Sequence, residues 1–359
     1  MFAYYLLAGI PLLLALLLYS IKYTYRLGKL PYQKEIIRVF FLIYFLLLAL
    51  RAETIGTDTW NYLVKFRAVR NYTWAVCIDG LSSEWGYTGL TKLISLVTDN
   101  KQIYLAIIAL ITVYPLAKLY MEESEAPALT ISMYLILPMF QMLFSGLRQA
   151  VAMAFIPAVY RCTRERKFLR FLLLVWLASA FHKSAWVMLL LYPVYHARIP
   201  RKALIWVIPA LVAVVLFRTQ IFRVLVSVIS MVFLSDSVVI ENTGAYSMLI
   251  LFAMILAFSY VFLGNTDEET SGQRNILVLS VVVQSFAMVN RLAMRINYYY
   301  LLFLPLLLPK VIRRIPSKNK WFASLVEFVC CVYFLFYFFQ KAHKGTEGLG
   351  IFPYIPFWK

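Results

Sequence analysis

The sequence predicts an all-α integral membrane protein that crosses the bilayer many times. Hydrophobic residues make up 62% of its 359 residues and charged residues only 14%, about half the charged share of a soluble domain. Long apolar runs recur along the chain, and the short loops between them are rich in Lys and Arg. Such loops are typical of the cytoplasmic side of a membrane protein. The net charge of +18 therefore reflects topology, and we exclude nucleic-acid binding.

Four basic clusters set the orientation of the chain, because Lys and Arg are retained on the cytoplasmic side. The first apolar run, Phe2–Ile21, enters the first cluster from outside. No basic residues precede this run and no small-residue cleavage site follows it, so we interpret it as a spanning helix and not as a signal peptide. The clusters lie at Lys22–Arg38, Arg161–Arg170, Arg198–Lys202 and Lys310–Lys320.

Each later apolar run is expected to cross in the opposite direction to the run before it. At roughly 20 residues per crossing, the chain holds about twelve transmembrane helices, some short or re-entrant, in a single transmembrane domain over residues 1–359. Both termini are then extracytoplasmic, as are two longer segments at about 51–100 and 218–244. The crossings are Ile36–Leu50, Ile103–Tyr120, Ala128–Phe144, Leu147–Tyr160, a short pair within Phe168–Tyr195 that turns near His182, Ala203–Phe217, Tyr246–Leu263, Ile276–Asn290, Ile296–Pro309 and Trp321–Gln340.

Two acidic loops, MEESEAP and GNTDEETSGQR, fall on the side predicted to be cytoplasmic. Acidic residues have little weight in setting orientation, so we keep the topology.

This topology places five unusual polar motifs on the extracytoplasmic side. Such a convergence, in a topology drawn only from basic clusters and apolar lengths, indicates a functional site there. The motifs are RAETIGTDTWNY (Arg51–Tyr62), SSEWGY (Ser82–Tyr87), SGLRQA (Ser145–Ala150), AFHKSA (Ala180–Ala185) and NRLAMR (Asn290–Arg295).

Arginines in these motifs suggest an anion-binding site. Arg291 and Arg295 are one helical turn apart, so their guanidinium groups point the same way. A charge inside a span costs roughly 2.5–3.5 kcal/mol and is kept where it faces a cavity, a partner or a substrate. The alternatives are that Arg51 extends to the lipid headgroups, that Arg148 forms a buried pair with a carboxylate, and that one arginine of the Arg291–Arg295 pair is a headgroup anchor.

Three residues could orient or deprotonate a hydroxyl group: Asp58, Glu84 and His182, in that order of preference. Asp58 could instead only cap a helix that begins at Thr59. Glu84 could be a surface charge, and His182 a hydrogen-bonding residue at a helix turn. The tyrosines at 298–300 are compatible with an aromatic belt at the membrane interface.

No metal or nucleotide chemistry is predicted. The chain has no metal-ligand spacing, paired Asp-x-Asp, phosphate-binding glycine loop or nucleophile elbow. The cysteines Cys77, Cys162, Cys330 and Cys331 lack C-x-x-C spacing and support neither a disulfide framework nor a metal site. An enzyme on this face would therefore need a substrate that is already activated.

The ordered motifs R-x(4)-G-T-D-T-x-x-Y, E-x-G-Y, L-R-Q-A-V-A, F-H-K-S-A and R-x-x-x-R-x-x-x-Y resemble the EpsG family, whose members are Wzy-like bacterial exopolysaccharide and O-antigen polymerases. The similarity runs from about Arg51 to Tyr300. Carried over by position, the motif residues are Arg51, Gly56, Asp58, Tyr62, Glu84, Tyr87, Arg148, Gln149, His182, Arg291, Arg295 and Tyr299.

The resemblance implies a GT-C-like membrane glycosyltransferase architecture in the bacterial inner membrane, with the active site on the periplasmic face and no cofactor. It implies that a glycan on undecaprenyl pyrophosphate is transferred to the next lipid-linked repeat unit, with release of undecaprenyl pyrophosphate. A flippase and a chain-length regulator would be its partners within the lipid bilayer.

From charge type and sidedness, we assign the pyrophosphate to Arg51, Arg148, Arg291 and Arg295, and the sugars to Tyr62, Trp85, Tyr87, Gln149 and Tyr299. The alternatives are an O-antigen ligase, a glycosyltransferase that uses polyprenyl-phosphate sugars, a flippase for the lipid-linked oligosaccharide, and a structural subunit of a synthesis complex. The modest late loop argues against a ligase, and the outward clustering of polar residues argues against a flippase.

Overall fold

The computed structural model describes residues 1–25, 33–77, 84–200, 202, 204–230, 246–263, 267–315, 321–345 and 349–359. Within these ranges every regular element is a helix, and the only extended pairing is an isolated antiparallel bridge between Arg51 and Pro356. The all-α fold class is therefore confirmed. Parts of the predicted clusters Lys22–Arg38, Arg198–Lys202 and Lys310–Lys320, and most of the segment 218–244 after Ser230, lie outside the described residues.

The chain divides into two compact units. The first unit comprises Met1–Met188 with Ser317–Lys359, and the second comprises Leu189–Pro316. The single domain over residues 1–359 stays a prediction.

Several described helices have the length and composition of membrane spans. Two helices, α5 (Lys101–Glu123) and α18 (Trp321–Lys344), are each long and apolar enough to cross a bilayer, and up to five crossings result if each bent helix pair is one span. Shorter apolar helices include α10 (Phe168–Phe181) and α14 (Tyr246–Phe262). These features are those of a membrane-embedded protein, whereas about twelve crossings and the GT-C-like architecture stay predictions.

Two predicted crossings are broken by prolines. The run Ala128–Phe144 forms α6 (Pro127–Ile136) and α7 (Pro138–Ser145), which are bent by 63°. Leu137 between them is extended, with φ −77° and ψ 140°, because the proline that follows disfavours helical geometry in the residue before it. The run Leu147–Tyr160 likewise forms α8 (Leu147–Met153) and α9 (Ile156–Arg164), with a proline at the start of α9. Each of these two runs therefore consists of two helices, and the crossing of the bilayer by each run stays a prediction.

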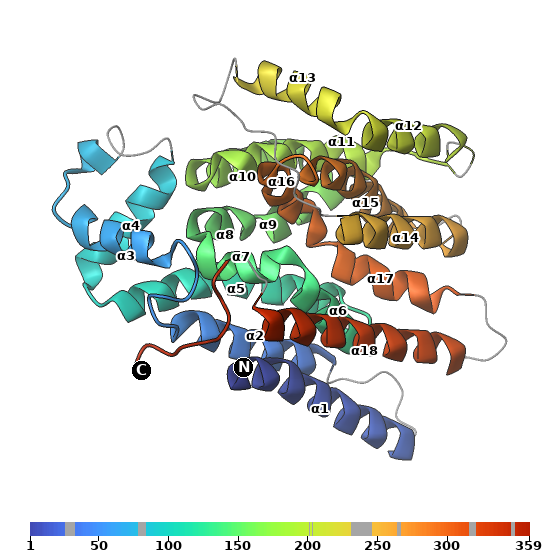
Figure 1. The fold of residues 1–359 in the computed structure, drawn as a ribbon, viewed down its shortest axis with the longest axis horizontal. Helices are drawn as coiled ribbons and strands as arrows, with labels where there is room; N and C mark the ends of the chain where they lie inside the picture. The colour runs from blue at the N-terminus through green and yellow to red at the C-terminus, as the bar shows by residue number, and fades with distance from the viewer. Residues whose placement is uncertain are drawn as a thin grey trace. The chain divides into compact units, whose positions relative to one another are not determined.

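Aromatic packing organises the first unit. The helix α2 (Gln33–Ala49) packs against α1 (Phe2–Tyr25) and α5, and α18 packs against α6 (Figure 1). Tyr44 on α2 is fully buried, and its hydroxyl donates to the carbonyl of Phe140 on α7 at 2.5 Å. This bond joins α2, which ends just before Arg51, to α7, which ends at Ser145. Two of the polar motifs therefore begin at helix ends that are packed together.

The short helices of the first unit carry the other motifs. These are α3 (Thr59–Val69), α4 (Trp85–Val97) and the 3₁₀ helix η2 (Lys183–Leu190), which follows α10. The break between α10 and η2 falls at His182, as the sequence predicted.

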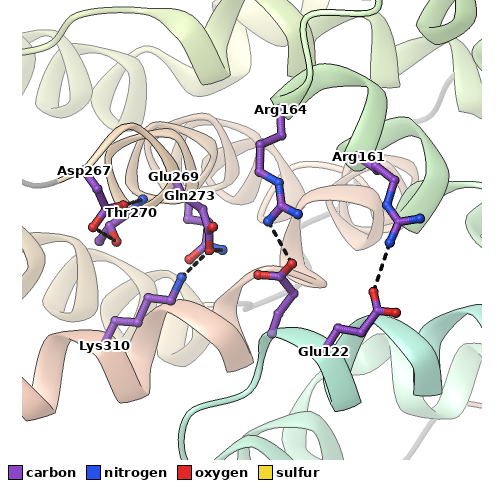
Figure 2. A network of polar contacts seen from close by, with 9 residues as sticks. Glu122, Arg161, Arg164, Asp267, Glu269, Thr270, Gln273 and Lys310 are labelled. Atoms are coloured by element: carbon purple, nitrogen blue, oxygen red, sulfur yellow. Dashed lines mark hydrogen bonds and ion pairs between the residues drawn. The ribbon is translucent and has the colours of Figure 1, made fainter.

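The acidic loop MEESEAP lies against a basic cluster. In the first unit, Arg161 pairs with Glu122 at 3.2 Å and Arg164 pairs with Glu123 at 2.8 Å (Figure 2). The end of α5 and the end of α9 therefore lie next to each other, as expected if both helices end on the cytoplasmic side. The exposed pair of Arg161 with Glu122 stabilises the fold only weakly, by about 0.2–1 kcal/mol.

The second unit also pairs an acidic loop with basic residues. It contains α11 (Leu191–His196), α12 (Leu204–Leu216), α13 (Arg218–Ser230), α14, α15 (Glu268–Ala287), α16 (Arg291–Leu301) and α17 (Leu304–Arg313). Glu269 at the start of α15 accepts from Lys310 at 2.6 Å (Figure 2), and Glu268 pairs with His196 at 3.1 Å. The second acidic loop is therefore also matched by basic residues at one end of its unit.

A buried polar chain orients α16. The Ser280 hydroxyl donates to the side-chain oxygen Oδ1 of Asn297 at 2.8 Å. The side-chain nitrogen Nδ2 of Asn297 donates to Oε1 of Gln284 at 2.9 Å. All three side chains are buried. Buried amides need such partners, so this chain fixes the rotation of α16 on α15.

Sidedness can be measured by cysteine labelling in a variant whose four native cysteines are replaced by serine. Trp60 is exposed at the start of α3, and Lys167 is exposed in the basic loop after α9. We expect a membrane-impermeant maleimide to label Trp60→Cys in spheroplasts, and to label Lys167→Cys only after detergent opens the membrane. The reverse pattern would overturn the topology.

Candidate functional site

Two sequence motifs meet at Ser145. The Thr57 hydroxyl is 2.8 Å from the Ser145 hydroxyl, and the backbone N–H of Asp58 donates to the same oxygen at 3.2 Å. Gly56 makes this approach possible, because its φ is 89° and a Cβ there would lie 2.4 Å from the Phe144 carbonyl oxygen. The GTDT turn therefore sits directly on the SGLRQA turn.

Three motifs, SGLRQA among them, meet around the carboxylate of Glu84, which is 5% exposed. One of its oxygens accepts from Arg148 Nη1 at 2.6 Å. The other lies 2.5 Å from His182 Nδ1 and accepts from the Lys183 backbone N–H at 3.2 Å. Arg148 Nε also donates to the Tyr62 hydroxyl at 3.4 Å. Four of the five predicted motifs thus contact one another within the first unit.

Close helix packing produces this geometry. Glu84 immediately precedes α4, and His182 is an extended residue at the end of α10. A Cβ at Gly86 would lie 2.9 Å from the Ala180 carbonyl oxygen. Only glycine therefore allows the first turn of α4 to approach the last turn of α10 closely enough to join Glu84 to His182.

The environment of Glu84 keeps it ionised. Burial by itself would raise the pKa of this carboxyl, but the hydrogen bond and charge of His182, the charge of Arg148 and the Lys183 N–H together hold its pKa below the ordinary 4.5. An ionised carboxylate only accepts hydrogen bonds, so the Nδ1 of His182 donates to Glu84. Nε2 is then the acceptor of the ring whenever the imidazole is neutral. Glu84 is therefore better suited to orienting His182 than to accepting a proton.

Asp58 has a different environment. It occupies the N-cap position of α3, yet its side chain makes no capping hydrogen bond. The alternative that Asp58 serves only as a cap is therefore wrong. No ion pair or side-chain hydrogen bond of its half-buried carboxylate is found among the described residues, so none of these residues occupies the carboxylate.

Arg148 forms the predicted carboxylate pair, but the pair is not sealed. The side chain of Arg148 is 37% exposed, against 6% for that of Glu84. One edge of the guanidinium is held by Glu84 and Tyr62, while the exposed part can still donate to an anion.

The predicted sugar-binding residues of the first unit are mostly buried. Tyr62 and Tyr87 are 7% and 6% exposed, and the Tyr87 hydroxyl is 2.6 Å from that of Tyr104. Gln149 is also buried, whereas Trp85 is 43% exposed. Trp85 therefore offers an accessible ring beside Glu84, and sugar contacts by the other three stay predictions.

Arg51 lies apart from solvent. It is 1% exposed, its Nη1 donates to the Leu48 carbonyl at 2.5 Å, and its guanidinium lies 5.9 Å from the centre of the Phe144 ring. The alternative of a headgroup anchor is therefore wrong, because such a side chain would reach the surface. Its role in pyrophosphate binding stays a prediction.

Arg291 and Arg295 lie in the second unit, one turn apart on the exposed face of α16. The helix begins at Arg291, where Asn290 accepts from the Leu292 N–H at 2.7 Å. A site shared with Arg148 stays a prediction. Tyr298, Tyr299 and Tyr300 are all buried, at 5%, 0% and 2% exposed, so the interpretation of these tyrosines as an aromatic belt at the interface is wrong.

Sequence reasoning missed two contributors. Ser145 was only a member of a motif, although it joins two turns. The C-terminal residues 349–359 carried no polar signal, although they pack on the loop that contains Arg51. Among the described residues, no group of three or more His, Cys, Asp or Glu side chains could hold a metal ion, and Cys77, Cys162, Cys330 and Cys331 are free thiols.

A comparison with protein families matches the chain to the EpsG family over residues 35–355. The chain belongs to the EpsG family. The match includes every candidate residue from Arg51 to Tyr299, and it links the chain to exopolysaccharide biosynthesis at a membrane. Neither the curated proteins nor the solved structures gave a match.

The lowered pKa of Glu84 predicts an acid-sensitive fold. A carboxylate whose pKa is lower in the folded state stabilises that state above its unfolded pKa, and loses this contribution as the pH falls. We expect the melting temperature of purified protein to fall as the pH drops below about 4.5, and to fall less steeply for Glu84→Gln. Equal slopes would contradict the assigned environment of Glu84.

The packing at Gly86 predicts a position-specific effect within α4. Gly86→Val should displace the Ala180 carbonyl, separate Glu84 from His182 and destabilise the protein by about 1–3 kcal/mol. Gly89→Val is the matched control, because a Cβ at Gly89 has no neighbour within 4 Å. Denaturation in detergent measures both variants, and similar losses would show that only helix propensity had changed.

Proposed function

We propose that this EpsG family protein polymerises lipid-linked polysaccharide repeat units at the extracytoplasmic face of the bacterial cytoplasmic membrane. The donor is a growing glycan on undecaprenyl pyrophosphate, and the acceptor is a hydroxyl group of the next lipid-linked unit. The new bond joins the acceptor oxygen to the reducing-end carbon of the donor. The bond from that carbon to the pyrophosphate breaks, and undecaprenyl pyrophosphate leaves.

The single observation that supports this proposal most strongly is the Arg148–Glu84–His182 cluster. It places a half-exposed guanidinium and an oriented imidazole on one buried carboxylate. Transfer from a pyrophosphate needs both functions, since negative charge grows on the leaving group while the attacking hydroxyl loses a proton.

Arg148 is suited to the leaving group. A preorganised donor at a site of growing charge is worth about 2.7–4 kcal/mol of barrier. Glu84 and Tyr62 hold the guanidinium in place before the substrate arrives, so little reorganisation is needed. Arg291 and Arg295 would add charge for the second phosphate or for the acceptor lipid.

His182 is the proposed proton acceptor. Its Nδ1 is fixed by Glu84, so Nε2 can take the proton of the attacking hydroxyl, in the same way that a carboxylate orients the base of other hydroxyl-activating sites. Asp58, with its open carboxylate, would hold a sugar hydroxyl of the acceptor, and Trp85 would stack on a sugar ring.

The proposed reaction draws its free energy from the donor's bond to pyrophosphate, so it requires no nucleotide. A GT-C-like architecture, a flippase that delivers the repeat units and a chain-length regulator belong to this proposal. A ligase would use the same leaving-group chemistry with a different acceptor. A flippase would move the lipid-linked unit without making a glycosidic bond.

The assignment can be measured in a strain that lacks this protein. We expect wild type to restore a ladder of lipid-linked glycans on a gel, and Arg148→Ala or His182→Gln to leave single repeat units, because the loss of either group should slow transfer about 100-fold or more. Arg161→Ala is the control, since Arg161 is ion-paired with Glu122 away from the cluster.

Full ladders from both variants, at wild-type protein levels, would refute the assigned roles. Repeat units trapped on the cytoplasmic leaflet would favour the flippase. Single units attached to a different acceptor would favour the ligase.

A further inference from the structure

The last residues of the chain form a strap over the loop that follows α2. We call residues 349–359 the C-terminal strap. Within the described residues, four backbone hydrogen bonds of 2.9–3.1 Å join the strap to this loop. They run from Ala52 N to Ile355 O, from Gly56 N to Gly350 O, from Thr57 N to Leu349 O and from Phe357 N to Leu50 O.

Side chains anchor the strap to the core of the first unit. The Tyr4 hydroxyl on α1 donates to the Ile351 carbonyl at 2.6 Å, and the Tyr354 hydroxyl donates to the Leu47 carbonyl on α2 at 3.0 Å. Ile351 is fully buried, and the Phe352 ring lies 4.6 Å from that of Tyr4. The strap is therefore a packed part of the fold, and Figure 1 shows the C-terminus at the same end of the unit as the N-terminus.

The strap holds the two residues that precede Asp58. It accepts from the N–H groups of Gly56 and Thr57. On its other side, the same turn is held by Ser145 through the Thr57 hydroxyl and the Asp58 N–H. The turn is thus clamped between the strap and the residue three positions before Arg148.

The position of the Asp58 carboxylate depends on this clamp. Its side chain does not cap α3 and makes no ion pair within the described residues, so among these residues the backbone of the turn sets its position. The helix that follows, α3, also carries Tyr62, which accepts from Arg148. A shift of the turn would therefore move Asp58 and disturb a contact of Arg148 together.

We propose that the C-terminal strap is a positioning element of the site, which sets Asp58 relative to the Arg148–Glu84–His182 cluster. This inference rests on the proposed function. The strap touches no reacting atom. It acts through the backbone of Gly56 and Thr57.

Gly350 offers a local test, because its φ is +63° and its carbonyl accepts from Gly56. A Cβ there would lie 3.6 Å from Thr57 Cγ2. Gly350→Val should displace the strap from the turn, since a β-branched residue strongly disfavours this backbone conformation. Gly350→Asn is the rescue variant, because Asn tolerates it. Gly345→Val is the matched control, since Gly345 has φ +60° with no neighbour within 4 Å of its Cβ.

The readout is polymerisation by the purified full-length chain in proteoliposomes with lipid-linked repeat units. For Gly350→Val we expect kcat to fall about 10-fold or more, as misplacement of a site group does. We expect KM for the acceptor to rise as well, because Asp58 would hold a sugar hydroxyl of the acceptor. Gly350→Asn and Gly345→Val should keep wild-type kcat per folded molecule.

Wild-type kcat for Gly350→Val would overturn the proposal, as would equal losses for Gly350→Val and Gly345→Val. If Gly350→Val does not fold, Tyr4→Phe decides. This near-isosteric change removes one anchor of the strap, and wild-type kcat for Tyr4→Phe would then overturn the proposal. A wild-type protein that makes no polymer would instead refute the proposed function, which separates the two failures.

Discussion

The candidate site depends on one buried carboxylate. Glu84 must be paired wherever it is buried, because an uncompensated charge inside a protein costs several kcal/mol, and removing one partner of a buried pair typically costs 3–5 kcal/mol. Its partners come from two other segments, Arg148 on α8 and the turn at His182 and Lys183. The requirement to satisfy Glu84 therefore draws three distant stretches of chain together, and it does so without help from regular sheet or disulfide. In this pairing the side chains of Arg148 and His182 stay partly exposed, at 37% and 23%.

Prolines and glycines make room for this pairing. The bend at Pro138 and the break before α9 divide two apolar runs into short helices. The polar turn at Ser145 and Gly146 joins two of these short helices, α7 and α8. Gly56 and Gly86 then permit contacts with the carbonyls of Phe144 and Ala180 that no larger residue allows. The site is thus built from irregular backbone that is buried within protein, which is the condition under which such backbone is tolerated in membrane proteins. Catalysis by this cluster would require such rigidity, because transfer depends on hydrogen-bond donors that are in place before charge develops.

The fold class and the residues of the Arg148–Glu84–His182 cluster could be predicted from the sequence. The contacts among these residues could not. Apolar runs identify membrane helices, and Lys and Arg in the loops between them indicate the cytoplasmic side. Polar motifs are easily recognised in such an apolar sequence. The pairing of Glu84 with His182 could not be predicted, since it depends on how closely α4 approaches α10. Tyr62 and Tyr87 were expected to contact sugars, yet aromatic residues in such motifs serve equally well as core. The C-terminal strap left no sequence signal, because its bonds to the loop are made by the backbone.

The central claim is that glycosidic bonds form at the cost of the pyrophosphate linkage to lipid. The most direct measurement reconstitutes the purified protein in proteoliposomes with undecaprenyl-pyrophosphate-linked repeat units, and quantifies both products in one reaction. The account predicts one undecaprenyl pyrophosphate released for each glycosidic bond formed, and loss of both products in Arg148→Ala. Movement of the lipid-linked units across the bilayer with no release of undecaprenyl pyrophosphate would contradict it.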